Sequence, residues 1–345
     1  MDSVKIRERG LQTGSAVFFI FLLVATSWAQ IQTNGYFAYD FVNNQADEGF
    51  LKGSFANPRM GFTLSGAITQ NSSFICEALL REGERIELKQ ALVILKFSDY
   101  FVSNLGLYLV PFGKYNEANR PHQTEFINSP LTAQTFYPRD WRDMGFLIQG
   151  RVKGIYYSAY LGNGLQEADK LSRGLAFDDN NTSQSIGGRV GIFLDQGFDV
   201  SYSHHRGRYD NEEERNLVYH AGNVEWQTEN FRILAEYILT SIDNPAGFQQ
   251  GEGEGYFVQM SIRLGQIRPV ASFQKIKYED PFHGPGFLAP PVPGEGIDRE
   301  KKRWSVGFVS KILENVRIKV EYDFNTNIKD EFKHDVFLCQ MALNF

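Results

Sequence analysis

The stretch from residue 315 to residue 325 reads NVRIKVEYDFN and alternates between apolar and charged side chains. Its apolar positions are Val316, Ile318, Val320, Tyr322 and Phe324, and its charged positions are Arg317, Lys319, Glu321 and Asp323. A period of two residues indicates a β-strand with one apolar and one charged face, because successive side chains of a strand point to opposite sides. This strand alone is compatible with a soluble sandwich or with a transmembrane barrel.

The same alternation recurs from Gln30 onward in segments of about ten residues, and helical periodicity is absent. Short breaks occur at 152–154, 195–197, 228–230, 265–266 and 313–314. Long breaks rich in Pro, Gly, Asn and charge lie between them, at 113–141, 163–184, 207–215, 241–253, 279–301 and 326–333. Alternating short turns and long loops are typical of an up-and-down antiparallel outer-membrane barrel, and a sandwich has no reason to alternate in this way.

Earlier segments complete the count of strands. They lie at about 31–41, 56–67, 73–81, 86–97 and 103–111. The sequence therefore predicts an all-β fold, a single transmembrane barrel of about sixteen strands formed by residues 30–345. A barrel of that size leaves a water-filled lumen, whereas eight strands would fill with their own side chains.

Composition excludes several classes of protein. The chain has 345 residues and a formal charge of −6, which argues against nucleic acid as a partner. The only continuous apolar run, Ala16 to Ala25, is too short for a spanning helix. Two cysteines, Cys76 and Cys339, are too few for a disulfide framework, and both are expected to face outward without pairing.

The N-terminus resembles an export signal. Lys5, Arg7 and Arg9 precede the apolar run, and the sequence Ser27-Trp28-Ala29 provides small residues where a signal peptidase cleaves. We expect a signal peptide at 1–29, cleaved after about Ala29, in preference to an uncleaved anchor. Together with the barrel pattern, this predicts the outer membrane of a bacterium as the location.

The last strand ends in Phe345, and its odd positions from Phe337 onward are apolar. A terminal aromatic residue on an amphipathic last strand resembles the signal that the outer-membrane assembly machinery recognises. The expected partners are this machinery together with outer-membrane lipid and lipopolysaccharide.

Three segments carry a family resemblance: IELKQALVILKFSD at 86–99, LGLYLVPFGKYNE at 105–117 and YPRDWRDMG at 137–145. They resemble the phosphate-selective porin O/P type of outer-membrane porin. The resemblance implies a sixteen-stranded porin, commonly a homotrimer, with an inward-folded constriction loop, a role that we assign to 113–141.

That loop is long for a compact protein, which usually indicates function or disorder, and its aromatic residues favour packing. Its candidate pore residues are the basic Lys114, Arg120, Arg139 and Arg142 and the acidic Glu117, Glu125, Asp140 and Asp143, with His122 near neutral. An anion filter needs a surplus of positive charge along the path, whereas these charges balance. Two interpretations stay open: the charges line the pore, or they pair with each other and pin the loop. Replacing Arg120 and Arg139 by Glu should shift the reversal potential toward cations if both face the pore.

Further charges are predicted to face the lumen because they alternate with apolar residues. The wall residues are Arg189, Arg232, Arg263, Arg317 and Lys319, with Arg151, Glu236, Glu321 and Asp323. A polar wall is required of any water-filled barrel and names no solute. The aromatic residues are expected in the girdles at the membrane surface: Trp304, Tyr322, Tyr256, Tyr237 and Phe345.

Enzymatic and metal-binding interpretations are weaker. His204 and His205 are adjacent on a strand, so their side chains point to opposite faces and do not share a metal easily. Ser203 shares a face with His205, but no third catalytic partner can be named. We expect no metal, no cofactor and no catalysis.

The sequence thus predicts a channel for passive diffusion of small hydrophilic solutes or ions, with anions such as phosphate among the candidates. The first alternative is a non-conducting structural or ligand-binding barrel, plugged by its own loop. A hydrolase on the barrel wall is the second.

Overall fold

The computed structural model describes residues 31–45, 52–81, 85–168, 171–176, 180–245, 250–279, 298–327 and 334–345. The predicted signal peptide, 1–29, lies outside the described residues. In the described part of the chain, no helix is long and apolar enough to cross a bilayer.

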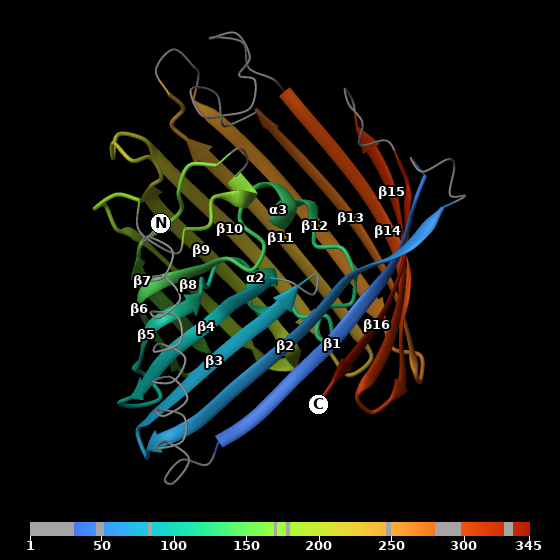
Figure 1. Ribbon diagram of the computed structural model, residues 1–345, viewed down its shortest axis with the longest axis horizontal. Helices are drawn as coiled ribbons and strands as arrows, with labels where there is room; N and C mark the ends of the chain where they lie inside the picture. Colours follow the sequence, from blue (N-terminus) through green and yellow to red (C-terminus); the bar gives the residue numbers. More distant parts are fainter. Residues whose placement is uncertain are drawn as a thin grey trace, which may run out of the picture.

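The described residues form sixteen antiparallel strands that close into one barrel (Figure 1). The strands are β1 (Ile31–Asn44), β2 (Gly53–Thr69), β3 (Ser72–Arg81), β4 (Arg85–Lys96), β5 (Val102–Leu109), β6 (Arg142–Val152), β7 (Ile155–Gly162), β8 (Ser185–Leu194), β9 (Phe198–Arg208), β10 (Asn216–Gln227), β11 (Phe231–Ile242), β12 (Gly251–Ile262), β13 (Ile267–Glu279), β14 (Asp298–Leu313), β15 (Val316–Asn327) and β16 (Val336–Asn344). Each strand pairs with its neighbour in sequence, and β1 pairs with β16 to close the wall. The predicted fold class is confirmed.

The connections alternate in length as predicted. Only Lys153 and Gly154 separate β6 from β7, whereas the segment from 163 to 184 separates β7 from β8. Lys153 has a φ of 56° and Gly265, between β12 and β13, has a φ of 66°. Such left-handed residues let a short turn follow the twist of its two strands. The predicted loop at 279–301 lies largely outside the described residues, and β14 begins within it, at Asp298.

The two faces of each strand have opposite environments. On β15, Lys319, Glu321 and Asp323 are buried inside the barrel, while Phe324 on the other face is 46% exposed. Trp304, beside Phe324 in the register, is also exposed on the outside. A soluble sandwich would bury the apolar face instead. An apolar outer surface around a polar interior therefore identifies a transmembrane barrel.

Both cysteines are free, in agreement with the sequence. Cys339 lies opposite Phe41 and Val320, and Cys76 lies opposite Leu64 and Ala91.

The pairing of the strands in the barrel wall becomes irregular near the start of the loop. Lys89 is an extra residue in β4, since Glu77 pairs with Gln90 while Ala78 pairs with Leu88. Pairing of β4 with β5 reaches only Ala91 and Leu107, although β5 continues along β6 to Leu109. The end of β5 is thus released from β4, and the segment that follows it is free to turn inward.

Candidate functional site

The connection between β5 and β6, residues 110–141, contains two short helices, α2 (Tyr115–Ala118) and α3 (Leu131–Thr135). Its polar groups bond to inward-facing side chains of ten strands. These partners are Glu77 and Arg81 on β3, Lys89 on β4, Arg189 on β8, Asp199 and Ser203 on β9, Tyr219 on β10, Glu236 on β11, Gln259 and Ser261 on β12, Arg268 and Gln274 on β13, Arg303 on β14, and Lys319, Glu321 and Asp323 on β15. Only a segment inside the barrel can reach strands on such different sides, and Figure 1 shows α2 and α3 within the barrel's outline.

Aromatic residues anchor the loop on one side of the lumen. Trp141 is fully buried, with its ring centroid 5.4 Å from that of Phe112 and 4.7 Å from that of His205 on β9. Phe136 and Tyr137 are also buried in this cluster, and the Tyr219 hydroxyl on β10 donates to the carbonyl of Phe136 at 2.5 Å. The aromatic packing predicted for the loop is therefore present.

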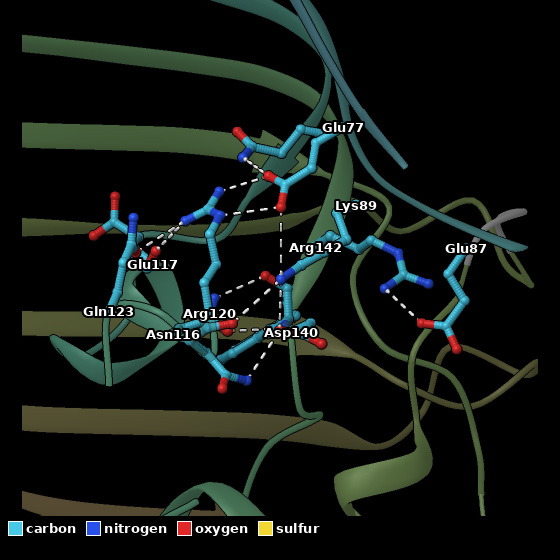
Figure 2. Close-up of polar contacts among 12 residues, drawn as sticks. Glu77, Glu87, Lys89, Asn116, Glu117, Arg120, Gln123, Asp140 and Arg142 are labelled. Atoms are coloured by element: carbon cyan, nitrogen blue, oxygen red, sulfur yellow. Dashed lines mark hydrogen bonds and ion pairs between the residues drawn. The ribbon is translucent and has the colours of Figure 1, made fainter. Parts of the chain in front are cut away.

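A charged network ties the loop to β3 and β4 (Figure 2). Arg120 donates to both carboxylate oxygens of Glu77, from Nε at 3.0 Å and from a terminal nitrogen at 2.5 Å. The Lys89 ammonium lies 3.0 Å from the Asp140 carboxylate, and Arg81 donates to the same carboxylate at 3.0 Å. Glu77 and Lys89 are completely buried. The network fixes Arg120 and the second end of the loop, at Asp140, to the wall.

A second network ties α2 to the opposite side of the wall. Lys114 donates to Asp199 on β9 at 2.7 Å, and the Lys114 amide donates to Glu236 on β11 at 3.0 Å. Arg189 on β8 pairs with Glu117 at 2.5 Å. The Glu117 side chain is nevertheless 42% exposed, so it faces the part of the lumen that the loop leaves open.

The remaining predicted loop residues have different environments. Asp143 is buried and accepts hydrogen bonds from the amides of Met144, Asn163 and Gly164, so it holds the connection from β7 to β8 rather than lining a path. Arg142 is 3.8 Å from Glu87. Arg139 is exposed and, among the described residues, forms no ion pair.

The interpretation that these charges pair with each other is wrong for the described residues. The ion pairs of the loop are made with the wall: Lys114 with Asp199, Glu117 with Arg189, Arg120 with Glu77, Glu125 with Arg232 and Arg268, and Asp140 with Arg81 and Lys89. The physical reason is that the inward face of each strand supplies charges complementary to the loop. Because Arg120 is committed to Glu77, Arg139 is the better probe of the two arginines predicted to face the pore.

Asp140 and His122 are among the loop residues whose pKa values are altered. Burial alone would raise the pKa of Asp140, but the Lys89, Arg139 and Arg81 cations outweigh it and lower this pKa to about 2. Burial, with Arg120, Arg317 and Lys319 nearby, lowers the pKa of His122 to about 4. At pH 7 Asp140 is therefore charged and His122 is neutral.

A cavity of about 780 Å³ lies below the loop, at the end of the barrel that carries the short turns. We call it the vestibule. Its basic lining residues are Arg232, Arg263, Arg268, Lys311 and Arg317, and its acidic ones are Glu125 and Glu314. Among the described residues, Arg263, Lys311 and Arg317 form no ion pair. The vestibule therefore carries a surplus of positive charge.

The predicted wall residues all face the interior. Arg232, Arg263 and Arg317 line the vestibule, and Arg189 bonds to the Gly113 carbonyl and to Glu117 of α2. Lys319 is buried and donates to Thr124 at 2.9 Å, so it supports the loop and does not line the vestibule.

Sequence reasoning missed several wall residues that hold or face the loop: Glu77, Lys89, Asp199, Arg268 and Lys311. Glu77 carried a signal, since it is a carboxylate amid the apolar run from Phe74 to Leu80. Lys89 carried one as well, since Glu87 and Lys89 alternate with the apolar Ile86 and Leu88.

The histidines and Ser203 have structural partners. His205 is buried in the interior with Tyr160, whose hydroxyl lies 2.8 Å from its Nδ1, while His204 lies beside His220 on the other face, with ring centroids 4.8 Å apart. Ser203 accepts a hydrogen bond from the Gly113 amide at 3.3 Å. In the described part of the chain, no group of three or more His, Cys, Asp or Glu residues is placed to hold a metal.

No family model matches the chain. An uncharacterized protein of Aquifex aeolicus (strain VF5) is 25% identical over 170 residues, which is 46% of this chain. The match spans 39% of the length of that relative.

Solved structures match the fold over nearly the whole chain. OmpF of Salmonella typhi, in complex with daunomycin, has a TM-score of 0.67 and 14% identity, covering 93% of this chain and 99% of its own. An anion-selective porin from Comamonas acidovorans has a TM-score of 0.66 and 11% identity, covering 92% and 100%. The trimer form of OmpT, an outer membrane protein of Vibrio cholerae, has a TM-score of 0.66 and 9% identity, covering 92% and 99%. At these identities the likeness shows the fold alone, a closed antiparallel β-barrel.

Proposed function

We propose that this protein is an outer-membrane channel through which small hydrophilic anions diffuse passively, without catalysis. The observation that carries the proposal is the vestibule, where five basic side chains face two carboxylates. Rings of fixed charge select ions of opposite sign, since they raise the local concentration of the counter-ion. The porin fold supports a channel, and the anion selectivity of the structurally similar porin from Comamonas acidovorans agrees with the sign.

The proposed location of the protein is the bacterial outer membrane, as expected from the sequence. The chain is exported after cleavage near Ala29 and inserts into the outer membrane through recognition of Phe345. Short turns lie on the periplasmic side of such barrels, so the vestibule is the periplasmic mouth. Phosphate is the anion that the resemblance to phosphate-selective porins favours. A homotrimer is the proposed assembly, and the trimer form of the OmpT neighbour supports it.

The experiment is the reversal potential of the refolded chain across a planar bilayer in a potassium chloride gradient. For the native protein we expect a reversal potential whose sign indicates a preference for chloride over potassium. Arg263→Glu and Arg317→Glu should each shift the potential toward potassium, because both side chains lie in the vestibule without an ion partner among the described residues.

Lys153→Glu is the matched control. It makes the same change of charge at the short-turn end, in the exposed turn between β6 and β7. Cation preference of the native channel, or equal shifts in all three variants, would refute the proposed anion path through the vestibule.

One observation favours a second candidate, a barrel plugged by its loop. The loop bonds to side chains of ten strands, and a cavity of only about 40 Å³ remains where it faces Arg232, Leu234, Gln259 and Gln274. A plugged barrel would fold and insert but give no conductance steps.

A further inference from the structure

The carboxylate of Glu125 is held by four side chains of the wall. Gln259 Nε2 donates to it at 2.6 Å, Ser261 Oγ at 2.7 Å and a terminal nitrogen of Arg268 at 3.0 Å. A terminal nitrogen of Arg232 lies 3.8 Å away. Glu125 is 8% exposed, so these donors replace nearly all of the water that a free carboxylate would bind.

All four side chains belong to the wall and none belongs to the loop, and Arg232 is held in place by Glu225 on β10, to which its Nε donates at 2.8 Å. Arg232 on β11 lies directly opposite Ser261 on β12, and Ser261 lies opposite Val270 on β13, two residues from Arg268. The pairing of the strands therefore positions two guanidinium groups, an amide and a hydroxyl around one point, whether or not Glu125 is present.

Glu125 and Arg232 also lie where two cavities meet. Both residues line the vestibule of about 780 Å³ and the cavity of about 40 Å³ between the loop and β11 to β13. Arg263, Lys311 and Arg317 line the vestibule beside them. An anion that enters the vestibule thus meets this cluster where the lumen narrows.

We infer that Arg232, Gln259, Ser261 and Arg268 form a binding site for small carboxylate anions, and that Glu125 occupies it as a tethered ligand. A solute carboxylate competes with Glu125 for the same donors during passage. Removing the Glu125 side chain leaves the site open to a free carboxylate of similar size. The role in passage rests on the proposed function, whereas the binding site itself does not.

The test is chemical rescue of Glu125→Ala in the refolded full-length barrel. The temperature at which the barrel unfolds is read from its heat-dependent gel mobility, in sodium formate, sodium phosphate or sodium chloride at equal ionic strength. Glu125→Ala should unfold below the native protein, because Arg268, Gln259 and Ser261 lose the carboxylate to which they donate, and formate should restore most of the difference. Chloride should not.

Glu314→Ala is the matched control, because Glu314 is an exposed carboxylate of the same vestibule. Formate should leave its unfolding temperature unchanged. Adding Gln259→Leu to Glu125→Ala should abolish the rescue. The inference would be overturned if formate stabilised all variants equally, or if it did not stabilise Glu125→Ala. Stronger rescue by phosphate than by formate would assign the site to phosphate instead.

A second variant covers failure of Glu125→Ala to fold. Glu125→Gln keeps the shape of the side chain, and its ratio of chloride to potassium permeability should rise more than that of Glu314→Gln. An equal rise in both would contradict the tethered ligand. Rescue by formate without any conductance would support the binding site and reject the channel. Anion-selective conductance without rescue would support the channel and reject the binding site.

Discussion

Glu77 has no exposed surface and is surrounded by three polar partners, Arg120, Lys89 and Gln90. A buried carboxylate is stabilised only while such partners remain, and removing one member of a buried ion pair leaves the others unpaired. Glu77 is thus the wall residue on which the position of Arg120 depends most directly.

Glu77→Ala should lower the free energy of unfolding by about 3–5 kcal/mol, because Arg120 and Lys89 stay buried without it. Glu87→Ala is the control, since Glu87 pairs with Arg81, Arg85 and Arg142 at longer distances of 3.4–3.9 Å near the lumen surface. It should lose about 1 kcal/mol or less. Urea unfolding of the barrel in vesicles, followed by tryptophan emission, measures both. Equal losses would contradict the ranking.

Asp140 makes the loop sensitive to acid. Its pKa of about 2 lies below the value of about 3.9 expected in the unfolded chain. Its contribution to stability is therefore fully present above about pH 4 and is lost as the pH falls toward 2. Asp140→Asn should be less stable than the native protein at pH 7, and the difference should shrink between about pH 4 and pH 2. Urea unfolding across this range tests it, and a constant difference would be the contrary result.

At the scale of single residues, the sequence predicts which way a side chain points better than it predicts which residues that side chain contacts. Alternation alone predicted that Arg189, Arg232 and Arg317 face the lumen. It could not predict that Arg120 binds Glu77, 43 positions away, or that the Ile127 amide reaches Glu321, 194 positions away. Those contacts depend on how the loop folds inside a closed wall, which no local pattern encodes.

At the scale of elements, β5 shows how a glycine lets the wall turn inward. Gly106 has a φ of 122°, and a Cβ built on it would lie 2.3 Å from the carbonyl oxygen of Ala91 on β4. Both the backbone angle and the space at this position therefore require glycine.

Gly106→Ala should destabilise the barrel by about 1–3 kcal/mol or reduce its folding yield, because the left-handed angle and the contact with Ala91 both disfavour a side chain. Gly222→Ala on β10 is the control, since nothing lies within 4 Å of its added Cβ. That variant should stay within about 0.5 kcal/mol of the native protein. The fraction of each variant that shifts mobility on heating reports folding, and an unaffected Gly106→Ala would remove the role given to this glycine.

Most strands could be predicted because period-two alternation and turn residues mark them clearly. The structure departs from the predicted alternation where the pairing of two strands is irregular. The extra residue at Lys89 changes which side chains of β4 face inward, and the alternation across 86–97 does not reveal it.

At the scale of the whole molecule, the even number of strands and the closure of β1 on β16 follow from the pattern of short and long connections. The chain's last residue takes part in that closure, because Phe345 and Gly35 exchange backbone hydrogen bonds at 2.9 and 3.0 Å. The filled lumen could not be predicted in the same way. Its charge depends on which residues the loop neutralises and which, such as Arg263, it leaves without an ion partner among the described residues.

The most direct test of the account is the single-channel conductance of the refolded chain in a planar bilayer, with the reversal potential measured on the same channels. We predict discrete conductance steps of uniform size and a reversal potential whose sign indicates selectivity for anions. Folded, heat-modifiable protein that inserts without producing steps would contradict the channel and favour the plugged barrel.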